Sequence, residues 1–154
     1  MIARPLLALA LCVVASVAIA QALPSKFDPR RDAIEDLAAA TAIAKAEHKR
    51  VIVDVGGEWC SWCHILDRFI ERNADVKEIV DRGYVWLKVN WSRENRNEAL
   101  LSRWPKVAGY PHLFVLDADG RLVHSQDTSE LEKGKDYDAA KVVAFLKRYS
   151  GSGR

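Results

Sequence analysis

Hydrophobic residues follow two different spacings along this chain. Residues 51–55 (VIVDV) and 84–90 (YVWLKVN) are short runs rich in β-branched and aromatic side chains, which predict strands. Residues 30–48 and 138–149 instead carry apolar side chains at intervals of three and four, which predicts helices. The chain therefore combines both kinds of element.

The remaining runs complete the order of elements. Asp28-Pro29 precedes the first helical stretch and is typical of a helix start. A helix is expected after the first strand, and a short one at residues 98–104. The runs 113–116 and 121–124 flank a polar turn and predict a hairpin. The resulting order (helix, strand, helix, strand, helix, strand, strand, helix) predicts an α/β fold with a central mixed β-sheet flanked by helices.

The N-terminal residues differ from the rest of the chain. Residues 6–20 (LLALALCVVASVAIA) are wholly apolar or small and end in Ala18-Ile19-Ala20, a small-x-small pattern typical of signal-peptide cleavage. This run is short for a transmembrane helix, which needs about 20 apolar residues. We therefore predict a secretory signal peptide at residues 1–20, with an uncleaved anchor as the alternative.

Cleavage after Ala20 changes the expected charge and organisation of the mature chain. It removes one arginine, so the 23 Lys and Arg residues fall to 22 against 21 acidic residues. That balance gives no reason to expect nucleic acid as a partner, and no stable membrane anchor should remain after cleavage. The mature chain should comprise a tether at residues 21–29, one domain at residues 30–150 and a flexible tail at residues 151–154.

Two of the three cysteines form a C-x-x-C motif. Cys12 would leave with the signal peptide, so the mature chain would keep Cys60 and Cys63, followed directly by His64. This spacing suits a redox disulfide, the attachment of a c-type haem or part of a zinc site. Zinc needs about four ligands, more than this motif supplies, and the one methionine that could be an axial haem ligand is Met1. A purely structural disulfide is disfavoured, because so small a loop constrains the unfolded chain little.

Redox exchange fits the position of this motif best. The cysteines follow a predicted strand and a Gly56-Gly57 break, and they precede a predicted helix. Free N–H groups and the positive end of the helix dipole stabilise a thiolate at a helix N-terminus. We therefore expect the pKa of Cys60 to lie below its ordinary value, so that Cys60 attacks and Cys63 resolves the mixed disulfide. This chemistry needs neither a cofactor nor a metal.

Residues 53–63 (VDVGGEWCSWC) resemble the active-site segment of the thioredoxin superfamily, in which an aspartate lies six residues before the first cysteine, as Asp54 does. Three later segments resemble further motifs of that superfamily in the same order: a central strand with a lysine (87–90), the cis-proline segment with its following strand (109–116) and the closing hairpin (119–123). The resemblance spans residues 30–150 and implies a thioredoxin fold. Among exported members, the periplasmic C-terminal domain of DsbD is similar in also having an Ala- and Lys-rich helix before its active site.

The resemblance also implies roles for residues around the cysteines. Asp54 should be buried behind Cys63 with a raised pKa, and it should accept the proton of Cys63 during resolution. Lys88 should pair with Asp54 and tune it. His64 departs from the superfamily pattern, which commonly has a lysine there; as a cation, it would raise the thiolate content of Cys60. The plain alternatives are a solvated strand lysine and an exposed first-turn histidine.

Four further residues are implied in binding an extended client peptide. Pro111 should follow a cis peptide bond, with the backbone of Tyr110 facing the attacking cysteine and pairing with the peptide. Trp59 and Trp62 should form an apolar rim around the thiol, with core packing as the alternative for each tryptophan.

Together these features predict an exported thiol–disulfide oxidoreductase in the bacterial periplasm. It would exchange a Cys60–Cys63 dithiol/disulfide with cysteine-containing client proteins or with a redox partner. A thioredoxin-fold chaperone or scaffold without redox turnover is one alternative, and a c-type haem protein is another. The sequence does not indicate whether the exchange runs as reduction, oxidation or isomerisation.

Overall fold

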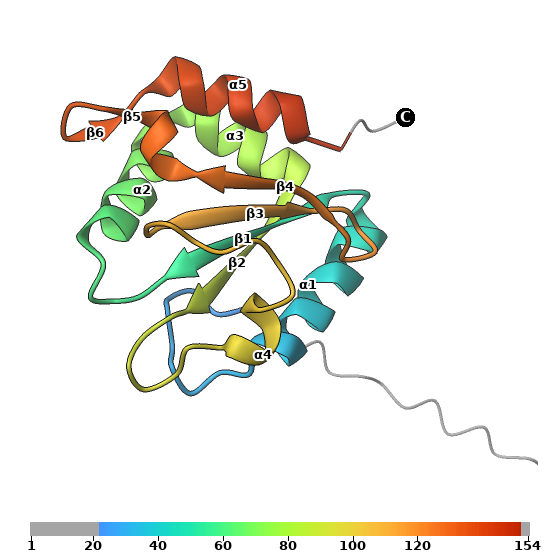
Figure 1. Ribbon diagram of the computed structural model, residues 1–154. Helices are drawn as coiled ribbons and strands as arrows, with labels where there is room; N and C mark the ends of the chain where they lie inside the picture. Colours follow the sequence, from blue (N-terminus) through green and yellow to red (C-terminus); the bar gives the residue numbers. More distant parts are fainter. Residues whose placement is uncertain (1–21, 152–154) are drawn as a thin grey trace, which may run out of the picture.

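The computed structural model describes residues 22–151 and shows a sheet layered between helices (Figure 1). The predicted signal peptide, its cleavage site and Cys12 lie outside the described residues, as does the tail after Gly151. Within the described part, no helix is both long enough and apolar enough to cross a membrane.

The order of elements agrees with the predicted one, with the helix after the first strand divided into two and with a 3-10 turn and a small hairpin added before the last helix. The helices are α1 (Ala33–Glu47), α2 (Ser61–Arg72), α3 (Ala74–Gly83), α4 (Glu98–Leu101) and α5 (Ala139–Tyr149), with a 3-10 turn η1 (Thr128–Leu131). The strands are β1 (Arg50–Gly56), β2 (Tyr84–Asn90), β3 (His112–Leu116), β4 (Leu122–Asp127), β5 (Glu132–Lys133) and β6 (Asp136–Tyr137). The predicted strand at residues 84–90 coincides with β2. The last predicted helix starts one residue later than expected, because Asp138 is the N-cap of α5.

The main sheet is mixed, as the sequence predicts. Its strand order is β2-β1-β3-β4, with β1 parallel to β2 and antiparallel to β3, and with β3 antiparallel to β4. Helices α1 and α4 cover one face, while α2, α3 and α5 cover the other (Figure 1). The strand β1 is central and covered on both faces, so its residues after Arg50 are buried without alternation.

The side chains of β1 point alternately into two hydrophobic cores, one on each face of the sheet. One of these buried side chains is acidic. The three valines of β1 belong to the core under α1, whereas Ile52 belongs to the core under α2, α3 and α5. Because successive side chains of a strand point to opposite faces, Asp54 shares the face of Ile52. Asp54 is fully buried, and it lies opposite Lys88 in the parallel register with β2.

The start of α1 corrects the expectation from the sequence. The sequence predicts a helix over residues 30–48, beginning at Asp28-Pro29. Asp32 is instead the N-cap, and its side chain accepts hydrogen bonds from two N–H groups of the first turn. The Asp28 carboxylate is engaged by the backbone and side chain of Arg30. That carboxylate closes a local turn at residues 28–31, and the helix begins only after this turn.

The segment between β4 and α5 contains structure that the sequence did not reveal. The turn η1 and the hairpin of β5 and β6 occupy residues 128–137. Tyr137 of β6 is buried and packs on Phe69 of α2 and on Trp62. Strands of two residues carry too little pattern to be predicted, yet this hairpin supports the helix that bears the cysteines.

Candidate active site

The two cysteines lie where the chain passes from β1 to α2. Cys60 is the N-cap of α2 and forms a disulfide with Cys63, with 5.3 Å between their Cα atoms. The Cys63 N–H donates to Cys60 Sγ at 3.1 Å, so the sulfur takes the place of a capping oxygen. Cys60 keeps 4% of its surface exposed, whereas Cys63 is fully buried. With the sulfurs joined to each other, neither is available as a haem thioether or as a zinc ligand in this state.

The position of Cys63 explains why β1 ends in glycine. A Cβ built on Gly56 would lie 2.4 Å from Cys63 Sγ and 3.2 Å from the ring of Phe27. Real Cβ atoms essentially never make contacts under 3.0 Å, so a larger residue would displace the sulfur. Asp54 and Gly56 are two positions apart on one strand and share a face. Cys63 Sγ therefore lies on the same face of the sheet as Asp54, two positions further along β1.

Asp54 lies at the centre of a small buried polar group. Its Oδ2 accepts hydrogen bonds from Lys88 Nζ at 3.3 Å and from Trp86 Nε1 at 3.2 Å. Its Oδ1 has no hydrogen-bond partner among residues 22–151. Burial raises the pKa of the Asp54 carboxyl, and the charge of Lys88 opposes that rise. The structure thus contains both the burial expected of Asp54 and its pairing with Lys88.

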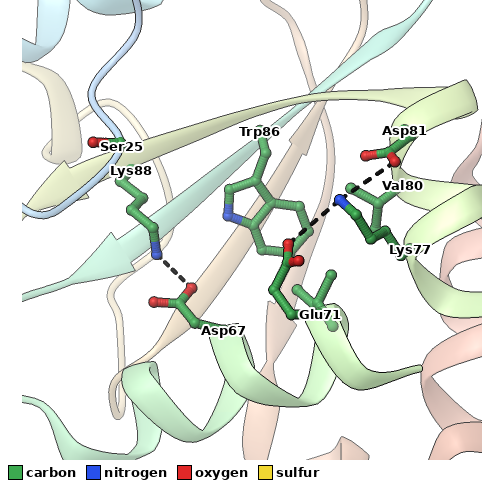
Figure 2. Close-up of a pocket in the computed structure, with 9 residues that line it drawn as sticks. Ser25, Asp67, Glu71, Lys77, Val80, Asp81, Trp86 and Lys88 are labelled. Carbon is green, nitrogen blue, oxygen red and sulfur yellow. Dashed lines mark hydrogen bonds and ion pairs between the residues drawn. The ribbon is translucent and has the colours of Figure 1, made fainter. Parts of the chain in front are cut away.

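Lys88 is shared between two carboxylates. Its Nζ lies 2.6 Å from Oδ1 of Asp67, a residue of α2 that sequence analysis did not identify. Burial lowers the pKa of Lys88, but Asp54 and Asp67 outweigh it, so this pKa is raised and the ammonium stays charged. Lys88 and Asp67 line a cavity of about 390 Å³ together with Trp86 and Ser25 (Figure 2). The buried acid is therefore connected to solvent through one ion pair.

An aromatic cluster adjoins the cysteine motif. It consists of Trp59, Trp91 and Tyr110. Trp91 and Tyr110 stack with their ring centroids 4.8 Å apart, and Trp59 meets both rings edge-on. Trp59 Nε1 donates to the Trp91 carbonyl at 2.8 Å, and 56% of the Trp59 surface is exposed. The Tyr110–Pro111 peptide bond is cis, as expected. Sequence analysis missed Trp91 because the segment that it begins, residues 91–97, is otherwise polar and suggests only a loop.

Trp62 and His64 have different surroundings. Trp62 packs inward, edge-on to Tyr137 with the centroids 5.6 Å apart, so only Trp59 of the two tryptophans in the motif lies in the aromatic cluster. His64 Nε2 lies 2.9 Å from the carbonyl oxygen of Glu58 and 3.9 Å from a carboxylate oxygen of the same residue. His64 is thus tied to the turn before the cysteines.

Phe27 completes the site from the segment before α1. Its ring belongs to the buried cluster that contains Cys60 and Cys63, and its N–H donates to Glu58 Oε1 at 2.9 Å. The sequence predicts only a tether here and gives no sign of either contact. A single aromatic residue in a polar segment has no periodic neighbours, so no pattern could have identified it.

Comparison with known proteins defines the family. The thioredoxin-like family model matches residues 32–118, more than half of the chain. This chain belongs to the thioredoxin-like family. The matched region runs from the N-cap of α1 past the end of β3, so it contains both cysteines, Asp54 and Lys88.

Individual relatives of this thioredoxin-like protein include DsbD. The thiol:disulfide interchange protein DsbD of Klebsiella pneumoniae is 26% identical over 106 residues, which is 69% of this chain and 17% of that protein. The solved disulphide isomerase from Xylella fastidiosa has a TM-score of 0.68 at 24% identity, covering 82% of this chain and 96% of that one. The oxidised C-terminal domain of DsbD from Neisseria meningitidis has a TM-score of 0.58 at 21% identity, covering 81% and 99%. These likenesses confirm the thioredoxin fold.

Proposed function

We propose that this thioredoxin-like protein is an exported thiol–disulfide oxidoreductase that exchanges its Cys60–Cys63 pair with client proteins or a redox partner in the bacterial periplasm. The observation that carries the proposal is this disulfide at the N-terminus of α2, with the buried carboxyl of Asp54 on the sheet face that Cys63 covers. A buried acid with a raised pKa next to a reactive group is typical of functional sites. The activity that names DsbD, thiol:disulfide interchange, is the same chemistry.

The exchange starts from the dithiol form. The Cys60 thiolate attacks one sulfur of a client disulfide, and the other client sulfur leaves as a thiolate and takes up a proton. Cys63 then attacks Cys60 Sγ, the Cys60–Cys63 bond forms, and the second client sulfur leaves with the electron pair of the broken bond. The client disulfide is reduced and the dithiol of this protein is oxidised. The same steps in reverse oxidise a client.

Asp54 is the proposed acceptor of the Cys63 proton in the second step. It shares a sheet face with Gly56, against which Cys63 Sγ rests. Its raised pKa makes the carboxylate a stronger base than an exposed aspartate. The Lys88 ammonium, held between Asp54 and Asp67 beside the cavity in Figure 2, stabilises the ionised form of Asp54 that accepts this proton.

Client recognition is proposed for the aromatic cluster and the adjoining Tyr110–Pro111 segment. Trp59, whose ring is exposed, directly precedes Cys60, and a hollow of about 630 Å³ is lined by Trp91 and Tyr110 of the same cluster. An extended peptide that carries a cysteine would lie across this surface and pair with the backbone. Trp62 would act indirectly by supporting α2, and His64 would influence Cys60 from the first turn of that helix.

Export is proposed from the apolar segment at residues 6–20 and its Ala18-Ile19-Ala20 end. Disulfides form and persist outside the reducing cytosol, which suits a protein that cycles through one. Intact-mass measurement of the exported protein should give a chain that starts at or near Gln21 and carries no haem. A mass increment that matches haem would contradict the redox assignment of the two cysteines.

Single-cysteine variants test the function. Cys63→Ser should accumulate mixed disulfides with client proteins because nothing resolves the Cys60 adduct, whereas Cys60→Ser should form none. Non-reducing electrophoresis with and without reductant displays these adducts. The parent protein should also catalyse insulin reduction, and neither variant should. Equal adducts from both variants would show that Cys60 is not the attacking residue. Absence of adducts and of turnover would favour a chaperone or scaffold.

A further inference from the structure

Phe27 touches the active site from a segment outside the sheet and the helices. The residue is 1% exposed, and its ring lies over Gly56, where a Cβ added to the glycine would be 3.2 and 3.3 Å from two ring carbons. The same Cβ would be 2.4 Å from Cys63 Sγ. The Phe27 ring and the resolving sulfur therefore cover the same end of β1 side by side.

The same ring also contacts the ammonium partner of the buried acid. Lys88 Nζ lies 4.3 Å from the centroid of the Phe27 ring, within the range of a cation–π interaction. This nitrogen is also the one bound to Asp54 and Asp67. One apolar side chain thus borders both the sulfur that loses a proton and the cation that faces the proposed proton acceptor.

The segment that carries Phe27 is held at several points. The Phe27 N–H donates to Glu58 Oε1 at 2.9 Å, and Asn95 Nδ2 donates to the Pro29 carbonyl at 2.9 Å. Ser25 lines the same cavity as Lys88, so the segment passes beside that lysine (Figure 2). These contacts fix the ring in place, because the backbone on each side of it is anchored.

We propose that Phe27 is a positioning residue for the resolving step: its ring excludes water between Cys63 and Asp54 and holds the Lys88 ammonium in place. The inference rests on the proposed function and assigns a further residue to it. During resolution, Cys63 loses its proton to Asp54 while the Cys60–Cys63 bond forms and the partner sulfur leaves with the electron pair. A dry contact makes this transfer direct, because no water competes for the carboxylate.

The surroundings of Asp54 show what removal of the ring would change. The titratable groups that act on Asp54 are Lys88 of β2, Asp67 of α2 and Tyr137 of β6, with the Trp86 indole as a hydrogen-bond donor. Cys63 of α2 lies on the same sheet face, over Gly56. Phe27 adds no charge to this set, and Lys88 keeps its two carboxylate partners when the ring is removed, so the main effect of removal on Asp54 is the entry of water. Because burial is the largest cause of the raised pKa of Asp54, admitting water should lower that pKa.

Reduced full-length protein mixed with the aromatic disulfide dithiobis(nitrobenzoate) in a stopped-flow instrument provides the test. The attack of Cys60 releases one equivalent of coloured thionitrobenzoate, and resolution by Cys63 releases a second. The rate of the second phase should rise with pH through the pKa of Asp54, because only the ionised carboxylate accepts a proton. In the series Phe27→Leu, Phe27→Val and Phe27→Ala, the midpoint of this rise should move progressively to lower pH. We expect a shift of roughly one pH unit for alanine.

Leu23→Ala is the matched control. Leu23 lies in the same segment but packs against the core under α1, so its loss should loosen the segment without moving the midpoint. Phe27→Leu keeps apolar cover over the site, so its midpoint should stay close to that of the parent. If Phe27→Ala does not fold, the midpoint of Phe27→Val still tests the inference. A midpoint that stays constant from the parent through Phe27→Val, or that moves equally in Leu23→Ala, would overturn the inference.

The same experiment distinguishes failure of the proposed function from failure of the inference about Phe27. A parent protein that releases no thionitrobenzoate would overturn the oxidoreductase assignment and this inference with it. A parent with two phases, in which Asp54→Asn slows the second phase and the Phe27 series leaves its midpoint unchanged, would overturn only the role of Phe27.

Discussion

Lys88 Nζ lies 3.3 Å from Asp54 Oδ2, and the two residues are register partners on neighbouring parallel strands. Lys88 keeps 11% of its side chain exposed, while Asp54 keeps none. The Lys88 ammonium therefore favours the ionised form of Asp54 and opposes the rise in its pKa, while Asp54 stays buried. The acid strength of Asp54 depends on this neighbour, which a single substitution removes.

Lys88→Met should shift the pH dependence of turnover to higher pH. The positive charge of Lys88 lowers the pKa of Asp54, so its loss should raise that pKa further and leave less carboxylate ionised at neutral pH. Insulin reduction at neutral pH should fall roughly tenfold and recover partly in alkaline buffer. Lys77→Met is the control, because Lys77 lines the same cavity but pairs with Glu71 and Asp81 (Figure 2). Equal losses from both variants would contradict a specific role of Lys88.

Asp54→Asn should stabilise the oxidised protein at neutral pH. The pKa of Asp54 in the folded protein is raised above the ordinary value of 3.8. The protonated carboxyl therefore contributes its full stability below pH 3.8, and this contribution is lost as the pH rises through the folded-state pKa. The advantage of the variant should therefore grow by about 1.4 kcal/mol for each pH unit between the two pKa values. Urea unfolding from acid to neutral pH measures it. Asp67→Asn removes a carboxyl that keeps 37% of its surface exposed, and it should not reproduce this advantage.

Gly56→Ala should destabilise the protein and disturb the cysteine pair. The added Cβ would lie 2.4 Å from Cys63 Sγ, so either the sulfur or the strand end must move. We expect a loss of roughly 1–3 kcal/mol in the free energy of unfolding, together with slower closure of the disulfide. Gly109→Ala is the control, because nothing lies within 4 Å of its added Cβ, and it should change stability by about 0.5 kcal/mol or less. Similar stabilities for the two variants would argue against tight packing at Gly56.

Trp91→Ala should weaken the use of protein substrates more than that of small disulfides. Trp91 stacks on Tyr110 and supports the exposed ring of Trp59 edge-on, so its removal should break up the aromatic cluster. KM for a protein disulfide should rise about fivefold to tenfold. For dithiobis(nitrobenzoate), kcat/KM should stay within about twofold of the parent, because that reagent is too small to span the cluster. An equal loss with both substrates would place the effect at the cysteines instead.

The sequence by itself determined the features that depend on neighbours along the chain. The run at residues 84–90 predicted β2 because its β-branched and aromatic side chains favour a strand wherever they lie. The C-x-x-C motif could be placed at a strand-to-helix junction because both flanking elements have clear local patterns. The resemblance to the thioredoxin superfamily then identified Asp54 and Lys88, whose separation in sequence carries no local signal.

Only the tertiary structure decided which distant residues complete the site. Asp67 reaches Lys88 from α2, Trp91 stacks on Tyr110 from a polar loop, and Phe27 covers the resolving sulfur from the segment before α1. None of these contacts follows from spacing, because burial and charge pairing are set by the elements that the packed sheet brings together. The spacing of the cysteines and their place before a helix thus follow from the local sequence. The water-free and charged surroundings of the buried Asp54 depend instead on residues that the whole fold brings together.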